Sequence, residues 1–220
     1  GAATWTSGTT TITLTGLDAL TIHGNGQYLE VSGFTFVDAA ANEHSTSGPI
    51  TVDGLFRICT NIFNNCNQTI IIHGTSASSS LIDNNTANIT GNSWLDIFGS
   101  DNTAWDFGTT FGTTNYCYIK HNGMTAAGIG DGVFDAYGGS KFVFRYNNIT
   151  NGYWGWHGCD SSPRDSGFGW SPHSYEIYGN HVYYNNGGYY AIFNSRGGTG
   201  LMFSNTVSGR TDSGSAIYMQ

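Results

Sequence analysis

Two aspartates, a tyrosine and a histidine occupy two positions of a repeated phrase, and they are the residues best suited to chemistry. The phrase reads apolar-x-apolar-x-Gly. Its middle copies put Asp96 and Asp135 three residues before the glycine, and Tyr137 and His157 one residue before it. In a β-strand these two positions share one face, while the apolar positions share the other. If no rung of a coiled sheet lies between them, Asp96 and Asp135 are neighbours on one exposed face.

Paired carboxylates on adjacent strands suit glycoside chemistry. A backbone spacing of about 4.8 Å lets the carboxyl groups reach the separations that retaining or inverting glycosidases use. Mutual repulsion would raise one pKa, which suits a general acid, and His157 is a candidate base. The same pair could instead hold Ca²⁺ through carboxylate oxygens. The plainer interpretation is that these residues are ordinary polar side chains on a solvated sheet face.

Two long loops, residues 100–115 and 159–174, leave the same corner and would wall this face. Both are rich in Gly, Ser, Thr and Asp but carry aromatic residues, whose faces suit sugar rings. The predicted substrate-binding residues are Tyr137, Trp105, Phe107, Asp160, Arg164 and Trp170. Alternatively, the loop aromatics cover the barrel or pack on a neighbouring subunit.

A second phrase, apolar-x-x-Asn-x-apolar, sets the elements that position these residues. Its Asn slot falls at intervals of 23 to 38 residues. The slots are Gly33 in a weaker first copy, then Asn61, Asn84, Asn122, Asn147, Asn180 and Asn205. Gly and Asn tolerate the left-handed backbone that a sharp corner requires. The recurrence predicts a solenoid in which the Asn side chains form the corners and stack from coil to coil.

Each repeat therefore reads as strand, Gly corner, loop, strand, Asn corner, strand. No segment keeps a helical period, and 32 glycines disfavour helices. We expect an all-β fold, a parallel β-helix solenoid of roughly seven to eight coils with Asn and Gly corners, forming one domain over residues 1–220. An antiparallel sandwich with many turns is the alternative architecture.

The coil pattern resembles the right-handed parallel β-helix family, the pectate-lyase-like superfold of polysaccharide lyases, polygalacturonases and phage tailspikes. The resemblance covers nearly the whole chain, and it implies the right-handed winding. Three segments look like bacterial and phage β-helix repeat proteins, namely residues 155–162, 175–180 and 196–200. Enzymes of this superfold use an Arg or Lys as base, but Arg145 lies before the Asn corner, away from the predicted cleft.

The amino-acid composition limits the classes of partner that the protein could bind. The net charge is −8 with only seven Lys and Arg, which argues against nucleic acid. It also disfavours polyanionic glycans unless a cation bridges, and leaves neutral sugars or a Ca²⁺-assisted acidic substrate open. No apolar run is long enough for a membrane span. Cys59 and Cys66 flank one Asn corner and could form a disulfide, or could be buried thiols.

Two functions follow from these observations. The first is an extracellular, cell-surface or virion-associated protein that recognises a glycan and could cleave it as a glycosidase or lyase, using Asp96, Asp135 and His157. The second is a non-catalytic structural subunit of a filament, fibre or capsid decoration. The chain ends within a strand-like segment without a capping helix, so we expect a piece of a longer chain or closure by another subunit, including end-to-end homo-oligomers.

Overall fold

The described part of the chain consists of short β-strands joined by turns. The computed structural model describes residues 11–13, 28–37, 49–52, 54–73, 79–91, 93–99, 108–126, 132–154, 171–184, 191–195, 197–209 and 215–219. These residues contain strands and turns but no helix. Accordingly, no helix long and apolar enough to cross a membrane occurs in the part of the chain that the structure describes.

The strands form three sheets. Sheet 1 contains β1 (Thr11–Thr13), β3 (Thr35–Val37), β6 (Ile62–Cys66), β9 (Thr86–Ile89), β12 (Gly123–Ala126), β15 (Asn148–Thr150), β18 (His181–Tyr183) and β21 (Thr206–Ser208). Sheet 2 contains β4 (Ile50–Val52), β7 (Ile70–His73), β10 (Leu95–Phe98), β13 (Gly132–Tyr137), β16 (Tyr153–Trp154), β19 (Ala191–Ser195) and β22 (Ser215–Met219). Sheet 3 contains β2 (Leu29–Ser32), β5 (Phe56–Cys59), β8 (Leu81–Asp83), β11 (Cys117–Lys120), β14 (Lys141–Arg145), β17 (Ser174–Tyr178) and β20 (Thr199–Phe203).

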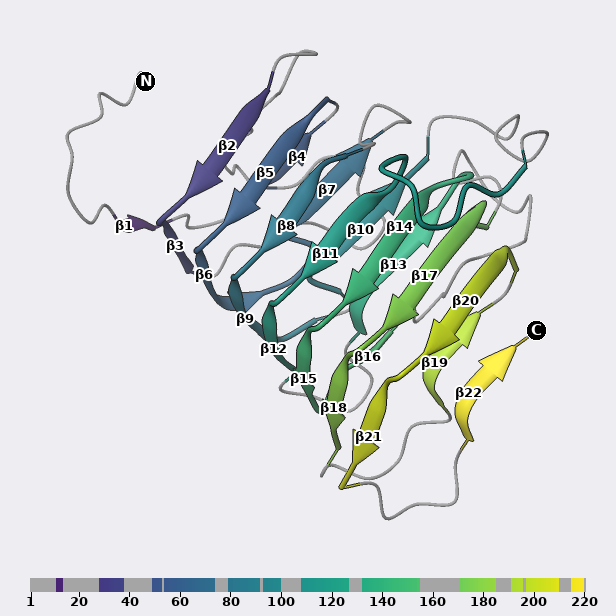
Figure 1. Cartoon of the computed structure of the whole chain (residues 1–220). Helices are drawn as coiled ribbons and strands as arrows, with labels where there is room; N and C mark the ends of the chain where they lie inside the picture. Colours follow the sequence, from purple (N-terminus) through teal and green to yellow (C-terminus); the bar gives the residue numbers. More distant parts are fainter. Residues whose placement is uncertain are drawn as a thin grey trace.

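The chain visits the sheets in the same order from β2 to β22: sheet 3, then sheet 1, then sheet 2. We call one such set of three strands a rung. Each strand pairs in parallel with its counterparts in the neighbouring rungs. Figure 1 shows the rungs side by side, with colours running from purple at one end of the array to yellow at the other. The all-parallel, solenoid-like arrangement confirms the predicted all-β class and contradicts an antiparallel sandwich.

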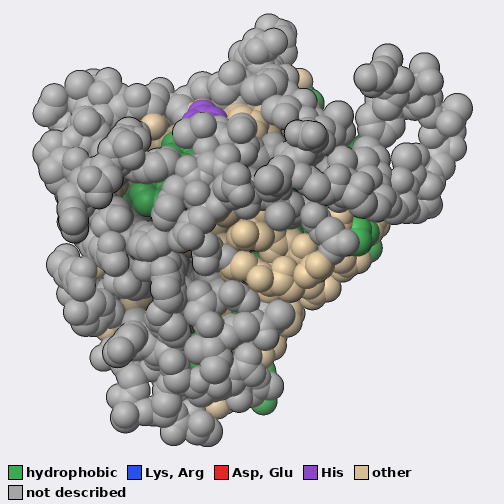
Figure 2. All heavy atoms as spheres, turned by 180° about the vertical axis from the view of Figure 1, so that it is seen from behind, with side chains coloured by type: hydrophobic (Ala, Val, Ile, Leu, Met, Phe, Trp, Pro, Cys, Tyr) green, Lys and Arg blue, Asp and Glu red, His purple; other side chains and the backbone are tan. Residues whose placement is uncertain are grey.

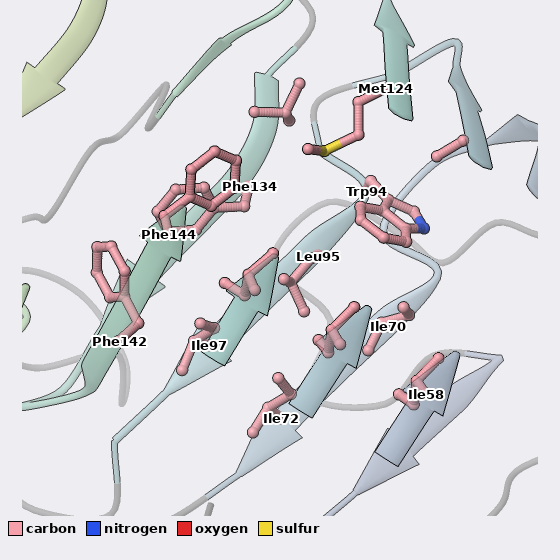
Figure 3. Packing of buried hydrophobic residues seen from close by; sticks show 14 of the residues in the cluster. Ile58, Ile70, Ile72, Trp94, Leu95, Ile97, Met124, Phe134, Phe142 and Phe144 are labelled. Atoms are coloured by element: carbon pink, nitrogen blue, oxygen red, sulfur yellow. The ribbon is translucent and has the colours of Figure 1, made fainter. Parts of the chain in front are cut away.

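The interior is one continuous hydrophobic column enclosed by the three sheets. In sheet 2 the two apolar positions of the Gly phrase, its first and third residues, point inward as the alternation predicts. Ile70, Ile72, Leu95 and Ile97 are all buried there. Figure 3 shows them in a row along the column, with Leu95 and Ile97 nearer the phenylalanines, where Phe134 of β13 stacks on Phe144 of β14. Parallel sheets covered on a face by such residues gain most of their stability from burial.

A ladder of asparagines runs along the corner between sheets 3 and 1. In each step, one Asn Oδ1 accepts hydrogen bonds from the backbone N–H and the Nδ2 of the Asn one rung earlier. For Asn85 and Asn122 both distances are 3.0 Å. The Nδ2 also donates to a carbonyl of the earlier rung, as Asn122 does to Ile82 at 3.0 Å. The ladder residues, most of them fully buried, are Asn61, Asn85, Asn122, Asn147, Asn180 and Asn205.

The structure corrects the predicted slot in two copies. Asn85, not Asn84, carries the ladder in the third copy, and in the first copy the slot holds Phe34, whose N–H donates to Asn61 Oδ1. It also corrects which residue bends. The left-handed position lies one residue before the slot; these residues are Gly33, Thr60, Asn84, His121, Tyr146, Gly179 and Ser204. The slot Asn therefore caps the corner, while its predecessor makes it.

The cysteines beside the first Asn corner are not joined. The Cys59 thiol donates to Glu30 at 3.9 Å, and the Cys66 thiol donates to the carbonyl of Asn88 at 3.4 Å. Both side chains are buried. The plainer of the two interpretations, buried thiols, is therefore the correct one for this pair.

Candidate functional site

The predicted carboxylate pair is brought together by the pairing of β10 and β13. The register places Asp96 directly opposite Asp135, and Phe98 opposite Tyr137. Both aspartates lie on the outer face of sheet 2, because the residues directly before and after each of them point into the core. These neighbours are Leu95, Ile97, Phe134 and Ala136. The predicted adjacency on neighbouring rungs is confirmed.

The predicted exposure of this face is wrong. Asp96 is 0% exposed, Asp135 5% and Tyr137 3%. The outer face is itself largely apolar, and Ile71, Phe98 and Tyr137 pack there as a second hydrophobic cluster, with Phe98 stacked on Tyr137 at 5.3 Å. Figure 2 views this side of the molecule, and among the described residues no Asp or Glu side chain is visible at its surface.

Asp96 is held by two side chains that arrive from outside its strand. Ser93 donates to Oδ1 and Gln68 donates to Oδ2, both at 2.6 Å. Burial raises the pKa of Asp96 from 3.8 to about 6, against the two hydrogen bonds, which lower it. A carboxyl group with this pKa could serve as an acid, but in this closed face its oxygens are already occupied by protein donors.

Two of the groups that donate hydrogen bonds to Asp135 lie in its own strand. Its Oδ2 accepts a hydrogen bond from the Tyr137 hydroxyl, and its Oδ1 accepts one from the backbone N–H of Ala136. The Tyr137 hydroxyl is therefore bonded to a carboxylate of the protein and does not face an open binding surface. The arrangement fits a buried and hydrogen-bonded polar network.

The remaining predicted site residues lie outside the described residues. They are His157, Trp105, Phe107, Asp160, Arg164 and Trp170. Within the residues that the structure describes, no group of three or more His, Cys, Asp and Glu side chains could hold a metal ion.

A different constellation stands on the outer face of sheet 3, centred on Arg145. The Arg145 guanidinium lies 4.9 Å from the ring centroid of Tyr118, 5.7 Å from that of Tyr146 and 5.8 Å from that of Tyr178. It donates a hydrogen bond from Nη1 to the Tyr178 hydroxyl at 2.6 Å. Three aromatic rings thus hold one cation in place by cation–π attraction.

Within the described residues Arg145 forms no ion pair with a carboxylate. The register sets Lys120 opposite Arg145, so two positive charges lie on adjacent rungs. Among the described residues neither forms an ion pair, whereas Arg57 and Asp83 on the same sheet pair at 3.0 Å. The Arg145 Nε is buried and donates to nothing in that part of the chain. Two positive side chains therefore lie side by side on a chain of net charge −8, with Asp83 on the other side of Lys120 and Glu176 on the same sheet.

Exposed aromatic residues flank the cation. Tyr146 is 46% exposed and stacks with His121 at 5.4 Å, and Phe203 is 50% exposed and stacks with Tyr178 at 4.7 Å. We call the surface formed by Tyr118, Lys120, His121, Arg145, Tyr146, Tyr178 and Phe203 the Arg145 surface. It combines ring edges, hydroxyl groups and a fixed guanidinium.

The segment 108–115 forms one border of the Arg145 surface. The N–H of Gly112 donates to Glu176 Oε1 at 2.6 Å, and the Tyr118 hydroxyl donates to the carbonyl of Thr113 at 2.6 Å. Gly112 takes a left-handed φ of 75°, which turns the segment back over the sheet. In Figure 1 this segment loops beside the ends of β11, β14 and β17.

The sequence contained a signal for this surface. Lys120, Arg145, Tyr178 and Phe203 each lie two residues before a ladder Asn. Once the Asn slots are aligned, these positions must form one outward column. Arg145 precedes the Asn corner rather than the Gly corner, so the Gly phrase alone does not point to it.

Comparison with known proteins adds no family. No protein-family model, no curated protein and no solved structure matches the chain.

Proposed function

We propose that the protein recognises a glycan on the Arg145 surface, and that the recognised sugar carries a carboxylate. The carrying observation is the Arg145 guanidinium, fixed by three tyrosine rings, beside Lys120 and without a carboxylate partner among the described residues. A guanidinium suits carboxylate oxygens through paired N–H donors. Tyrosine and histidine side chains add apolar contact and hydrogen-bonding groups for a sugar ring.

Recognition is favoured over cleavage. Asp96 and Asp135 have their oxygens bonded to protein donors and buried, so they support a structural role better than hydrolysis or elimination. The proposed setting is extracellular, at a cell surface or on a virion, because glycans are displayed there. For the fold, we propose a right-handed parallel β-helix of roughly seven to eight coils, since parallel crossovers are right-handed in about 98% of cases. Left-handed winding in an experimental structure would contradict it.

The test is binding to matched polysaccharides by isothermal titration calorimetry, with uronate-containing and neutral polymers of similar length. We expect binding to the uronate polymer only, and at least about tenfold weaker binding for Arg145→Gln, since charged hydrogen bonds contribute about 1.5–3 kcal/mol. Tyr146→Gly should also weaken binding. Lys141→Gln, on the same strand at its other end, is the control and should bind like the wild type.

Thermal melts followed by circular dichroism confirm that each variant is folded. Equal affinity for neutral and uronate polymers, or unchanged affinity in Arg145→Gln, refutes the proposal. A parallel assay for reducing ends and unsaturated products, with and without Ca²⁺, reports cleavage. If Asp96→Asn still forms product, the pair of carboxylates Asp96 and Asp135 does not catalyse the reaction.

A second candidate function is a structural subunit of a filament, fibre or capsid decoration. It is favoured by exposed apolar side chains on inner rungs, where Ile62 is 45% and Tyr183 43% exposed. Light scattering over a wide concentration range tests it. Ordered growth in mass supports the structural function, and a constant monomer mass argues against it.

A further inference from the structure

The segment 108–115 lies across the outer face of sheet 3, and we call it the strap. It is fixed to the sheet on two different rungs. The N–H of Gly112 donates to Glu176 of β17 at 2.6 Å, and the Tyr118 hydroxyl of β11 donates to the carbonyl of Thr113 at 2.6 Å. Because β14 lies between β11 and β17, the strap spans three rungs.

Burial on β14 indicates what the strap covers. Val143 points outward, because both of its neighbours on the strand belong to the core. The register sets Val143 between Tyr118 and Glu176. It is nevertheless only 1% exposed, and Glu176 only 6%. The strap is bonded to both residues that flank Val143, so it passes over this column of the sheet.

The next outward column, two residues further along each strand, remains partly exposed. It contains Lys120, Arg145 and Tyr178, paired in register, and then Phe203, which stacks on Tyr178 at 4.7 Å. Rungs are about 4.8 Å apart, so these four side chains run for about 14 Å along the solenoid. Beyond the column the chain bends away at the corner, where Tyr146 has a left-handed φ of 55°. The exposed strip is therefore narrow across the strands and long along the rungs.

We infer that the glycan is bound as an extended chain of several sugars that lies along the stacked rungs, with the strap on one side of it and the corner at Tyr146 on the other. This inference rests on the proposed function, since the carboxylate of one sugar would lie at Lys120 and Arg145. A chain laid along β14 instead would have to cross the strap, which occupies the place above Val143. The ligand class is then a linear acidic oligosaccharide rather than a single terminal uronate.

The test is isothermal titration calorimetry with glucuronic acid and with linear oligosaccharides of alternating glucuronate and N-acetylglucosamine, up to about six units long. We expect affinity to rise at least about tenfold from one sugar to about four, the length that four rungs can contact, and then to level off. Phe203→Ser should remove about fivefold of this gain, because an aromatic contact is lost. Lys141→Gln, which lies beyond the strap on β14, should leave the gain unchanged.

A pair of substitutions at Glu176 tests the strap. Glu176→Ala removes the acceptor for the Gly112 N–H, whereas Glu176→Gln keeps an oxygen there and removes only the charge. The ratio of tetrasaccharide to monosaccharide affinity should fall at least about threefold in Glu176→Ala, because the strap no longer flanks the chain, and should stay unchanged in Glu176→Gln. Gly112→Ala strains the turn of the strap, where φ is 75°, and should act like Glu176→Ala. Thermal melts confirm that each variant is folded.

Three results would overturn this inference alone, in a protein whose uronate binding still depends on Arg145. The first is an affinity that does not change with chain length. The second is a gain with length that Lys141→Gln removes and Phe203→Ser does not. The third is an unchanged affinity ratio in both Glu176→Ala and Gly112→Ala. Absence of uronate binding, or binding that Arg145→Gln leaves unchanged, would overturn the proposed function and this inference together.

Discussion

Replacing Asp96 by Asn should stabilise the protein at neutral pH and remove part of the pH dependence of its stability. Asn has nearly the same shape and can still accept from Gln68 through Oδ1 while donating to the Ser93 hydroxyl. The substitution therefore keeps the hydrogen-bonded network but removes the buried negative charge. A surface catalytic carboxylate would show no such gain.

The magnitude follows from the raised pKa of Asp96. A rise from 3.8 in the unfolded chain to about 6 in the folded one corresponds to about 3 kcal/mol. Between about pH 4 and pH 6 the folded state holds a proton that the unfolded state has lost. Stability from this group is therefore greatest below about pH 4, falls as pH rises through that window, and stays about 3 kcal/mol lower above it. That is a large share of a typical 5–15 kcal/mol stability.

The assay is urea unfolding followed by tryptophan fluorescence at several pH values from 4 to 7. We expect the wild type and Asp96→Asn to differ little at pH 4 and to diverge as the pH rises, with the variant more stable by up to about 3 kcal/mol at pH 7. Ser93→Ala removes a hydrogen bond that lowers the pKa of Asp96, so it should shift the end of the window to higher pH. A constant difference between wild type and Asp96→Asn at all pH values would refute the reasoning.

Three further predictions test the fold. Asn85→Ala should lower the free energy of unfolding by roughly 3 kcal/mol, because several buried ladder hydrogen bonds are lost, while Asn84→Gly should change it by less than about 0.5 kcal/mol. Equal effects in urea unfolding would contradict the assigned slot. Gly99→Ala should destabilise the protein by about 2 kcal/mol or more, because its Cβ would overlap backbone atoms of the next rung. Gly123→Ala should have a much smaller effect, because a Cβ there meets open space, and thermal melts compare the two variants. Burial raises the pKa of the Cys117 thiol to about 12, so iodoacetamide at pH 8 should leave it unmodified in the folded protein, as mass spectrometry can check. Rapid labelling without unfolding would be the contrary result.

The sequence predicted the coil and most of its corners because the phrase repeats a physical necessity. Each rung must bend once between sheets 3 and 1, and one amide per rung can satisfy the backbone there. The error at Asn84 arose because Asn84 and Asn85 are adjacent and both Leu81 and Ile82 fit the apolar position. Only the stacked geometry distinguishes the residue that bends from the residue that accepts.

The burial of the outer face of sheet 2 could not be read from strand alternation. Alternation tells which side of the sheet a residue faces, but not whether something packs on that side. A warning was present in the sequence, since Ile71 and Phe98 lie in the outward columns with Asp96 and Asp135. Apolar residues in an outward column indicate that this face is covered, and the carboxylates in the same column are then buried as well.

The proposed binding surface includes a corner whose backbone is strained. Tyr146 takes a left-handed φ of 55°, where a bulky side chain is strained, whereas the equivalent position one rung later is Gly179. A Cβ at Gly179 would lie 2.6 Å from the Tyr146 ring, so glycine there serves both the turn and the ring. The contacts that offset the strain at Tyr146 are its stacking with His121 and the Arg145 guanidinium against its ring. The same contacts form the proposed binding surface, so the strained corner is held in place by the groups that the glycan would meet.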